Sequence, residues 1–307
     1  MNKKENIDKL PLILVTGANG QLGQTIKEIS ESYPDFRYMF TDWEDLDITQ
    51  IGAVSKFFRD KNIDLSQFEE NPFVLINAAA YTNVDKAEDD MENCDNINNR
   101  AVASLARECM QLNGLMIHIS SDYVYDGENN IPYKEDDIAN PLSVYGRSKL
   151  CGDEAIINIM GNRGIVIRTS WLYSDYGNNF VSKMIEMSFN RDTISVVTDQ
   201  VGSPTYSTNL AVAIMSVLID GLNHRKFPYN IVNYGDSGVC SWYDLASMAI
   251  RYHGNPSCTV YPIITEEYPT KAVRPKYSLL SKQRFDRYYR IKRQHWTLGL
   301  EKYSKKI

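Results

Sequence analysis

The chain has 307 residues, of which 43% are apolar and 23% charged, and its formal net charge is −6. This length and composition can supply one large hydrophobic core or two smaller ones. The charges are spread along the chain without a basic cluster. We therefore expect no nucleic-acid partner and no attraction to an anionic membrane surface.

Cysteine usage and the N-terminus both bear on the cellular compartment. The five cysteines lie far apart and form no CxxC pair, which favours reduced thiols over a disulfide framework or a zinc site. The N-terminal MNKKENIDK is polar and has no apolar stretch behind its charges. It predicts neither a signal peptide nor a membrane anchor, and hence a cytoplasmic protein. The cysteines are Cys94, Cys109, Cys151, Cys240 and Cys258.

Short apolar runs alternate with amphipathic segments over the first 172 residues. Strands that are apolar on both faces are typical of a parallel sheet covered by helices. This alternation predicts an α/β fold, a doubly wound parallel sheet of the Rossmann type, as an NAD(P)-binding domain over residues 1–172. The expected strands are 10–17, 36–42, 73–80, 115–121 and 164–173, and the expected helices are 21–32, 49–59, 93–110 and 144–160.

The alternation becomes less regular after residue 172. Apolar pieces at 193–197, 229–235 and 258–263 are separated by turn-rich loops. We expect residues 173–307 to form mainly a smaller C-terminal substrate-binding lobe. Segments near 207–235 are expected to return to the first sheet.

The stretch TGANGQLGQ, residues 16–24, follows the first apolar run and holds Gly17, Gly20 and Gly23 at intervals of three. A glycine turn of this kind lets backbone N–H groups approach a pyrophosphate. The next helix, which begins with Gln21 and Leu22, directs its positive end at the same point. The alternative is a plain strand-to-helix connection that needs glycine for positive φ.

Residues after the next two strands favour a nicotinamide dinucleotide, NADH or NADPH. Asp42 follows the second strand about 20 residues beyond the turn, where an acidic side chain binds an adenosine ribose. Its carboxylate would repel the 2′-phosphate of NADPH and so favours NADH; an ordinary loop aspartate is the alternative. The remaining expected cofactor contacts are Asp47, Ile48, Ala78, Ala79 and Ala80, although tight helix packing also explains the three alanines.

The stretch SVYGRSK places Tyr145 and Lys149 one helical turn apart, on the same helix face. A phenol ordinarily loses its proton near pH ~10, and a neighbouring ammonium lowers that pKa. We therefore expect Tyr145 to act as a general acid or base, and both residues to contact the cofactor. The pair gains weight from its place between the fourth and fifth strands of a chain that opens with a glycine turn.

The fourth strand ends at Ser121 and Asp122, at the sheet edge where ligands bind in such folds. The Ser121 hydroxyl is expected to hydrogen-bond a substrate carbonyl, with Ser120 as the rival for this role and Asp122 as a further substrate contact. Asn98, early in the preceding helix, could hold a water molecule in a proton relay. An ordinary polar helix position explains Asn98 equally well.

Two residues of the later chain are expected at the substrate. Trp171 could enclose the sugar, although a buried core aromatic is the alternative. The guanidinium of Arg274 suits a diphosphate better than the amine of Lys276, with a surface ion pair as the alternative. The histidines show no metal-ligand spacing and are interpreted as structural or exposed; they are His118, His224, His253 and His295.

Motifs along nearly the whole chain resemble the extended short-chain dehydrogenase/reductases, and within them the reductases of dTDP-linked 4-keto sugars. The early motifs belong to the superfamily, and the middle and late ones are specific to this reductase group. The matching stretches are TGANGQLGQ, INAAAYTNVDKAE (76–88), ISSDYVYDG (119–127), NPLSVYGRSKL (140–150), IRTSWLY (167–173), VTDQVGSPTY (197–206), SWYDLA (241–246) and VRPKYSLL (273–280).

The resemblance implies an enzyme that reduces the 4-keto group of dTDP-4-dehydro-β-L-rhamnose to give dTDP-β-L-rhamnose. Tyr145 would supply the proton, Lys149 would bind the nicotinamide ribose and tune Tyr145, and Ser121 would hydrogen-bond the reacting oxygen. The family usually has threonine at the position of Ser121, so the hydroxyl is kept and a methyl group is absent.

The resemblance also leaves alternatives open. One relative is a non-catalytic regulatory subunit of methionine adenosyltransferase, and other superfamily members are epimerases or dehydratases of different nucleotide sugars. The intact Ser121, Tyr145 and Lys149 set counts against the first, and the late motifs count against the second. Members of the group can form homodimers and bind Mg²⁺ through glutamates at the subunit contact. No metal ligand is assigned in this sequence.

Overall fold

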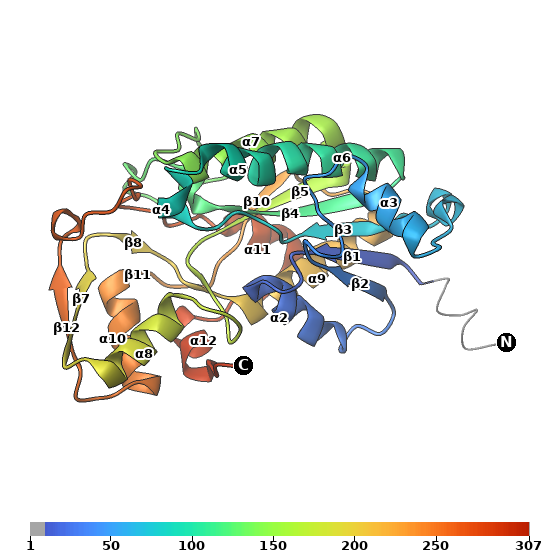
Figure 1. Cartoon of the computed structure of the whole chain (residues 1–307). Helices are drawn as coiled ribbons and strands as arrows, with labels where there is room; N and C mark the ends of the chain where they lie inside the picture. Colours follow the sequence, from blue (N-terminus) through green and yellow to red (C-terminus); the bar gives the residue numbers. More distant parts are fainter. Residues whose placement is uncertain (1–9, 307) are drawn as a thin grey trace.

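Six parallel strands form the central sheet in the computed structural model, which describes residues 10–306 (Figure 1). The chain passes from β1 to the edge strand β2 and then returns to the other side of β1, so that the strand order reverses between β1 and β3. Ligands bind at such a switch point, beyond the carboxyl ends of the strands. In spatial order the strands are β10 (Ile231–Asn233), β5 (Gly164–Thr169), β4 (Leu115–Ser121), β3 (Val74–Asn77), β1 (Leu12–Thr16) and β2 (Arg37–Thr41).

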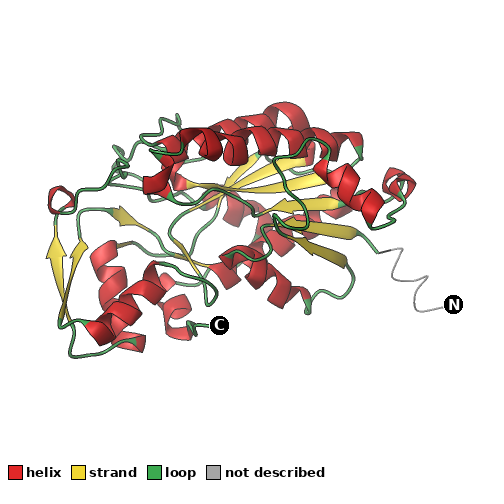
Figure 2. Cartoon of the chain, in the orientation of Figure 1, coloured by secondary structure: helices red, strands yellow, loops and turns green. Residues whose placement is uncertain are grey.

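Helices cover both faces of this sheet (Figure 2). Alternate residues of β1 face opposite ways, with Leu12 and Leu14 in one core cluster and Ile13 and Val15 in the other, and all four side chains are buried. The prediction of a doubly wound α/β sheet is confirmed. The first cluster holds α3 (Ala53–Asp60), α6 (Ala101–Gln111) and α7 (Val144–Met160), and the second holds α2 (Gln21–Ser30), α9 (Ser207–His224) and α11 (Gln283–Tyr289).

The helix expected over 93–110 is not one continuous α-helix. It consists of α5 (Met91–Asp95), a π-helical turn η2 (Asn96–Arg100) and α6. A Cβ atom on Gly152 of α7 would lie only 2.3 Å from the Asn98 carbonyl oxygen, so α7 packs directly against this turn. Other short helices are α4 (Val84–Ala87), η1 (Leu65–Glu69), η3 (Asp122–Val124), η4 (Gly161–Arg163) and η5 (Thr265–Glu267).

The second lobe lies beyond the carboxyl edge of the sheet (Figure 1). Two of its helices begin at capping boxes, with Asn179 and Ser182 at the start of α8 and Ser241 and Asp244 at the start of α10. The helices are α8 (Phe180–Asn190), α10 (Trp242–His253) and α12 (Trp296–Lys302), and the strand pairs are β6 (Leu172–Tyr173) with β9 (Thr205–Tyr206), β7 (Thr193–Val197) with β12 (Thr259–Ile263), and β8 (Val201–Gly202) with β11 (Cys240–Ser241).

Three later segments pack with the first lobe. They are α9, β10 and α11, and α11 lies beyond the range 207–235 in which we expected return segments. The five cysteines are free thiols, as expected. Within residues 10–306 no helix is both long and apolar enough to cross a membrane. The expectation for MNKKENIDK concerns residues 1–9, which lie outside the described part of the chain.

Candidate active site

The glycine turn brings α2 and the segment after β3 into direct backbone contact. Gly17 has φ +69°, and a Cβ atom there would lie 2.6 Å from the Ala79 nitrogen. A Cβ atom on Gly23 would lie 2.2 Å from the Gly17 oxygen. Glycine at both positions therefore sets this spacing, and the alanine run lies against the turn. The contact of the three alanines with a cofactor stays a prediction.

The N-terminus of α2 fits an anion such as a pyrophosphate. Gly20 precedes the helix in an extended conformation, and no side chain caps it. The first amides of α2, including those of Gln21 and Leu22, thus have no acceptor within the helix and add to its positive end. The Gln21 Oε1 atom is buried without a hydrogen-bond partner. These features suit the dinucleotide expected from the sequence.

Asp42 is held against the glycine turn. Its Oδ2 accepts a hydrogen bond from the Asn19 amide at 2.8 Å, and its Oδ1 accepts one from the Trp43 amide at 2.8 Å. The carboxylate is therefore fixed beside the turn. In the same loop, Asp47 accepts hydrogen bonds from the amide and hydroxyl of Thr49, and the hydroxyl bond lowers the pKa of Asp47. Ile48 is buried beside it.

Tyr145 and Ser121 meet at the carboxyl edge of the sheet. Helix α7 begins at Ser143, whose hydroxyl accepts a hydrogen bond from the Gly146 amide and places Tyr145 in the first turn. Burial raises the pKa of Tyr145 above its ordinary value, and the nearby hydroxyl of Ser121 opposes the increase. The Ser121 hydroxyl also lies 3.0 Å from Asp122 Oδ1. The hydroxyl of Ser120 is instead buried without a hydrogen-bond partner.

Lys149 is turned toward the sheet. Its Nζ donates to the Ile119 carbonyl oxygen at 2.7 Å and lies 3.3 Å from His118 Nε2. Burial lowers the pKa of Lys149 to about 8, although Asp153 opposes this. We expected Lys149 to lower the pKa of Tyr145. That expectation is wrong for the chain without cofactor, because burial dominates at Tyr145 and the ammonium is directed at β4.

Asn98 joins three segments of the site. Its Oδ1 accepts a hydrogen bond from the Tyr81 amide at 2.9 Å, and its Nδ2 donates to the Tyr81 carbonyl and to Ser148 Oγ, both at 3.0 Å. It thereby fixes the backbone after the alanine run to η2 and α7. The proton relay through Asn98 stays a prediction.

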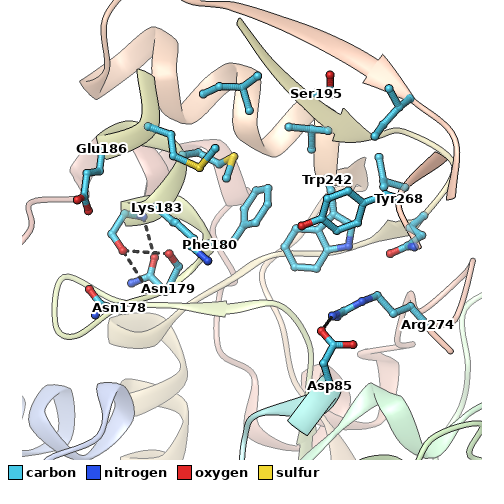
Figure 3. Close-up of a pocket in the computed structure, with 18 of the residues that line it drawn as sticks. Asp85, Asn178, Asn179, Phe180, Lys183, Glu186, Ser195, Trp242, Tyr268 and Arg274 are labelled. Carbon is cyan, nitrogen blue, oxygen red and sulfur yellow. Dashed lines mark hydrogen bonds and ion pairs between the residues drawn. The ribbon is translucent and has the colours of Figure 1, made fainter. Parts of the chain in front are cut away.

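A cleft of about 1400 Å³ opens between the sheet edge and the second lobe (Figure 3). Arg274 lies at its border, where Nη2 contacts Asp85 Oδ2 at 2.5 Å and Nη1 donates to the Tyr123 hydroxyl at 3.1 Å. The Tyr123 ring is edge-on to Tyr145, with 5.6 Å between the ring centroids. Arg274 and Tyr123 thus connect the cleft to Tyr145.

Trp171 lies behind the wall of this cleft. It has a positive φ of 49°, which interrupts the strand expected over 164–173 and separates β5 from β6. Its ring stacks on that of Trp242, with 3.7 Å between centroids, and its Nε1 donates to Ser278 Oγ. Trp242 lines the cleft. Any effect of Trp171 on a ligand in the cleft therefore acts through Trp242.

Several residues of the cleft belong to no motif that we recognised. They come from α8, β7, α10 and the loop after β12, and only tertiary structure brings these elements together. The residues concerned are Phe180, Lys183, Arg191 and Tyr268, whereas Trp242 lies within the stretch SWYDLA. No group of three or more His, Cys, Asp or Glu within residues 10–306 could hold a metal ion.

Residues 12–307 match the family model described as the RmlD substrate binding domain. The chain belongs to this family. A relative named dTDP-4-dehydrorhamnose reductase, from Aggregatibacter actinomycetemcomitans, is 35% identical over 295 residues, covering 94% of this chain and 97% of the relative. The resemblance that the motifs indicated is confirmed.

Solved structures of the RmlD family superimpose closely on this fold. The dTDP-4-dehydrorhamnose reductase of Clostridium acetobutylicum gives a TM-score of 0.85 at 38% identity, over 95% of this chain and 98% of that one. The reductase of the same name from Bacillus anthracis, solved in complex with NADP, gives 0.84 at 33% identity, over 96% and 98%. The sheet edge, the glycine turn and the cleft thus belong to the fold of an RmlD family member.

Proposed function

We propose that the chain is an NAD(P)H-dependent reductase that converts the 4-keto group of dTDP-4-dehydro-β-L-rhamnose to the alcohol of dTDP-β-L-rhamnose. The observation that carries this proposal is the position of Tyr145 near Ser121 at the switch-point edge of the sheet, joined to the cleft through Tyr123 and Arg274. The names of the full-length relatives support the same reaction. The product is the end point of dTDP-L-rhamnose biosynthesis.

The cofactor would lie along the switch point. Gly17, Gly20 and Gly23 with the first amides of α2 would hold the pyrophosphate, and Asp42 the adenosine ribose. Reduced nicotinamide supplies the hydride when it is bound. The NADP complex of the Bacillus anthracis relative supports a nicotinamide dinucleotide. Asp42 favours NADH over NADPH, because its fixed carboxylate opposes a 2′-phosphate.

Tyr145 would donate a proton to the alkoxide that develops at C4. Burial raises the pKa of its phenol, so the hydroxyl keeps its proton at neutral pH and can act as an acid. Ser121 would hydrogen-bond the same substrate oxygen, since its hydroxyl lies near that of Tyr145. Lys149, as an ammonium below its pKa of about 8, would bind the nicotinamide ribose.

The cleft would receive the dTDP part of the substrate. Phe180, Trp242 and Tyr268 offer aromatic surface to a base, and Lys183, Arg191 and Arg274 provide positive charge for a diphosphate (Figure 3). In this arrangement Arg274 would give up its ion pair with Asp85 and bind the diphosphate instead. Asp122, next to Ser121, would contact the sugar.

We further propose that the NAD(P)-binding domain comprises residues 1–172 with return segments, and that residues 173–307 mainly bind substrate. Sharing of the cleft between the sheet edge and α8, β7 and α10 supports this division. A cytoplasmic homodimer is the proposed setting. The match to enzymes of sugar-nucleotide metabolism supports the cytoplasmic location. The homodimers that members of this reductase group can form support the dimer.

The deciding experiment supplies dTDP-4-dehydrorhamnose, generated in place from dTDP-glucose, and follows NADH and NADPH absorbance separately. We expect rapid cofactor oxidation with the dTDP sugar and none with a UDP analogue. Oxidation with the UDP sugar alone would indicate another nucleotide-sugar enzyme of the superfamily. Absence of oxidation with every 4-keto sugar nucleotide would contradict the proposal and favour the regulatory-subunit alternative.

A further inference from the structure

A buried row of polar side chains crosses the sheet beneath the proposed active site. Thr16 of β1, Asn77 of β3 and His118 of β4 are direct neighbours in the strand register, and each is at most 1% exposed. Thr16 Oγ1 lies 2.7 Å from Asn77 Oδ1, and Asn77 Nδ2 lies 3.0 Å from His118 Nδ1. The row ends at Lys149, whose Nζ is 3.3 Å from His118 Nε2.

The charged and titratable groups around Lys149 come from four elements. On α7, Tyr145 and Asp153 lie one turn before and after it, and Asp153 pairs with the buried Arg168 of β5 at 2.9 Å. Cys94 of α5 also raises the pKa of Lys149, and His118 faces it from β4. The negative charge of Asp153 is balanced mainly by Arg168. Lys149 therefore depends on hydrogen-bond acceptors to remain charged. Ile119 O is one acceptor, and His118 Nε2 is the other.

The charge of Lys149 decides which atoms of this row donate hydrogen bonds and which accept them. A neutral imidazole has one N–H and one acceptor nitrogen. Toward an ammonium, His118 must accept at Nε2 and carry its proton on Nδ1, and Asn77 must then present oxygen to His118. Toward a neutral amine, whose lone pair is able to accept, His118 can donate from Nε2 and accept at Nδ1 from the Asn77 amide. The orientation of Asn77 in the structure matches the second pattern, in which Thr16 donates to Asn77 Oδ1.

We propose that His118 is a positioning residue for the reaction: it holds Lys149 at the floor of the site, and its tautomer changes whenever Lys149 gains or loses a proton. The row Thr16–Asn77–His118 then reverses its direction as a unit. The part of this inference that concerns catalysis rests on the proposed function, because it assumes that Lys149 binds the cofactor. The tautomer change does not depend on that assumption.

The tautomer is measured directly by long-range ¹H–¹⁵N NMR on protein labelled with ¹⁵N-histidine. Only four histidines are present, so the resonances lost in His118→Gln identify His118. Burial and Lys149 both lower the pKa of His118, so the ring stays neutral. We expect the Nδ1–H tautomer at about pH 6 and the Nε2–H tautomer at about pH 10, on either side of the Lys149 pKa of about 8. One unchanged tautomer, or an imidazolium at about pH 6, would overturn the proposal.

Two substitutions separate positioning from packing. In His118→Gln the amide end reaches the position of Nε2 and can serve Lys149, whereas in His118→Asn it reaches only the position of Nδ1 and the Lys149 contact is lost. The readout is NADPH affinity as a function of pH, followed by cofactor fluorescence. Wild type should lose affinity as pH rises through about 8, where Lys149 becomes neutral.

His118→Gln should keep this midpoint, and His118→Asn should lower it by about one pH unit, because a hydrogen bond to a charged group is stronger than one to a neutral group. Asn233→Leu, which removes a buried strand amide without contact to Lys149, is the control and should keep the midpoint. Equal midpoints in His118→Gln and His118→Asn would contradict the positioning role. Normal NADPH binding without turnover of the dTDP sugar would contradict the proposed substrate and leave the His118 inference intact.

Discussion

Tyr145 is held as a protonated phenol at the point where the sheet edge meets the cleft. Burial raises its pKa, and the ring packs edge-on against Tyr123, which in turn contacts Arg274. In the free protein Tyr145 therefore keeps its proton and can act as an acid. Loss of its proton in the proposed reaction would depend on Ser121 and on the charge of Lys149, one helical turn away.

Tyr145→Phe removes the proton and keeps the ring. We expect turnover to fall by at least ~100-fold, the lower end of what a positioned acid contributes, with cofactor affinity retained. Steady-state kinetics and NADPH fluorescence measure the two quantities. Tyr123→Phe is the matched control, since it removes a hydroxyl that binds Arg274 and should raise KM more than it lowers kcat. Near-normal turnover of Tyr145→Phe would refute the assignment.

We expect Asp42 to govern the choice between the two nicotinamide cofactors, because the Asn19 and Trp43 amides fix its carboxylate beside the turn. Asp42→Ala should increase kcat/KM with NADPH relative to NADH, since the repulsion of a 2′-phosphate is lost. Asp45→Ala, an exposed change in the same loop, should leave the ratio as it is. If the ratio in Asp42→Ala equals that of wild type, Asp42 does not select the cofactor.

The sequence pointed to those candidate site residues that belong to a local motif. Tyr145 and Lys149 share one helix, Ser121 ends one strand, and the glycine turn lies within nine residues. The row Thr16–Asn77–His118 was not foreseen, because its members are adjacent only through strand pairing. His118 was interpreted, like the other histidines, as structural or exposed. Lys149 was expected to act on Tyr145 because helix periodicity is visible in a sequence. Its contact with His118 across the sheet is not visible there.

At the scale of elements, helix α2 is positioned by backbone contact with the glycine turn. A Cβ atom on Gly23 would meet the backbone of Gly17 and Ala18, whereas one on Gly20 would have its nearest neighbour at 3.2 Å. Gly23→Ala should therefore displace the first turn of α2 and weaken NADPH binding by at least ~10-fold, about 1.4 kcal/mol. Gly20→Ala should cost less. Fluorescence titration compares the two, and equal losses would contradict this account of the turn.

Element boundaries departed from prediction where one residue has an unusual conformation. Gly52, with φ +78°, delays the start of α3 to Ala53, and Trp171 separates β5 from β6. Apolar periodicity continues across both positions, so neither break is visible as a change of pattern. The π-helical turn η2 lies within helical periodicity in the same way. Its cause is tertiary: Asn98 must reach both the Tyr81 backbone and Ser148.

At the scale of the whole molecule, the first lobe is built from distant parts of the chain. β10 is the sixth strand of the sheet, and α9 and α11 cover the face that contains Ile13, Val15 and Ile117. These three strand side chains are fully buried. Strand and helix patterns located the segments, but they did not show which face of the sheet each later segment covers.

Removing the later segments should therefore leave residues 1–172 without a folded core. The fragment would expose one face of the sheet, and each Å² of apolar surface left in water forfeits about 25 cal/mol. We expect it to bind a hydrophobic dye, to show no cooperative thermal unfolding, and not to bind NADPH. A fragment of residues 1–290 keeps α9, β10 and α11 and loses α12, so it should retain NADPH binding. Cooperative unfolding of residues 1–172 with NADPH bound would show that these residues fold independently. The return segments would then not be required for the folding of the domain.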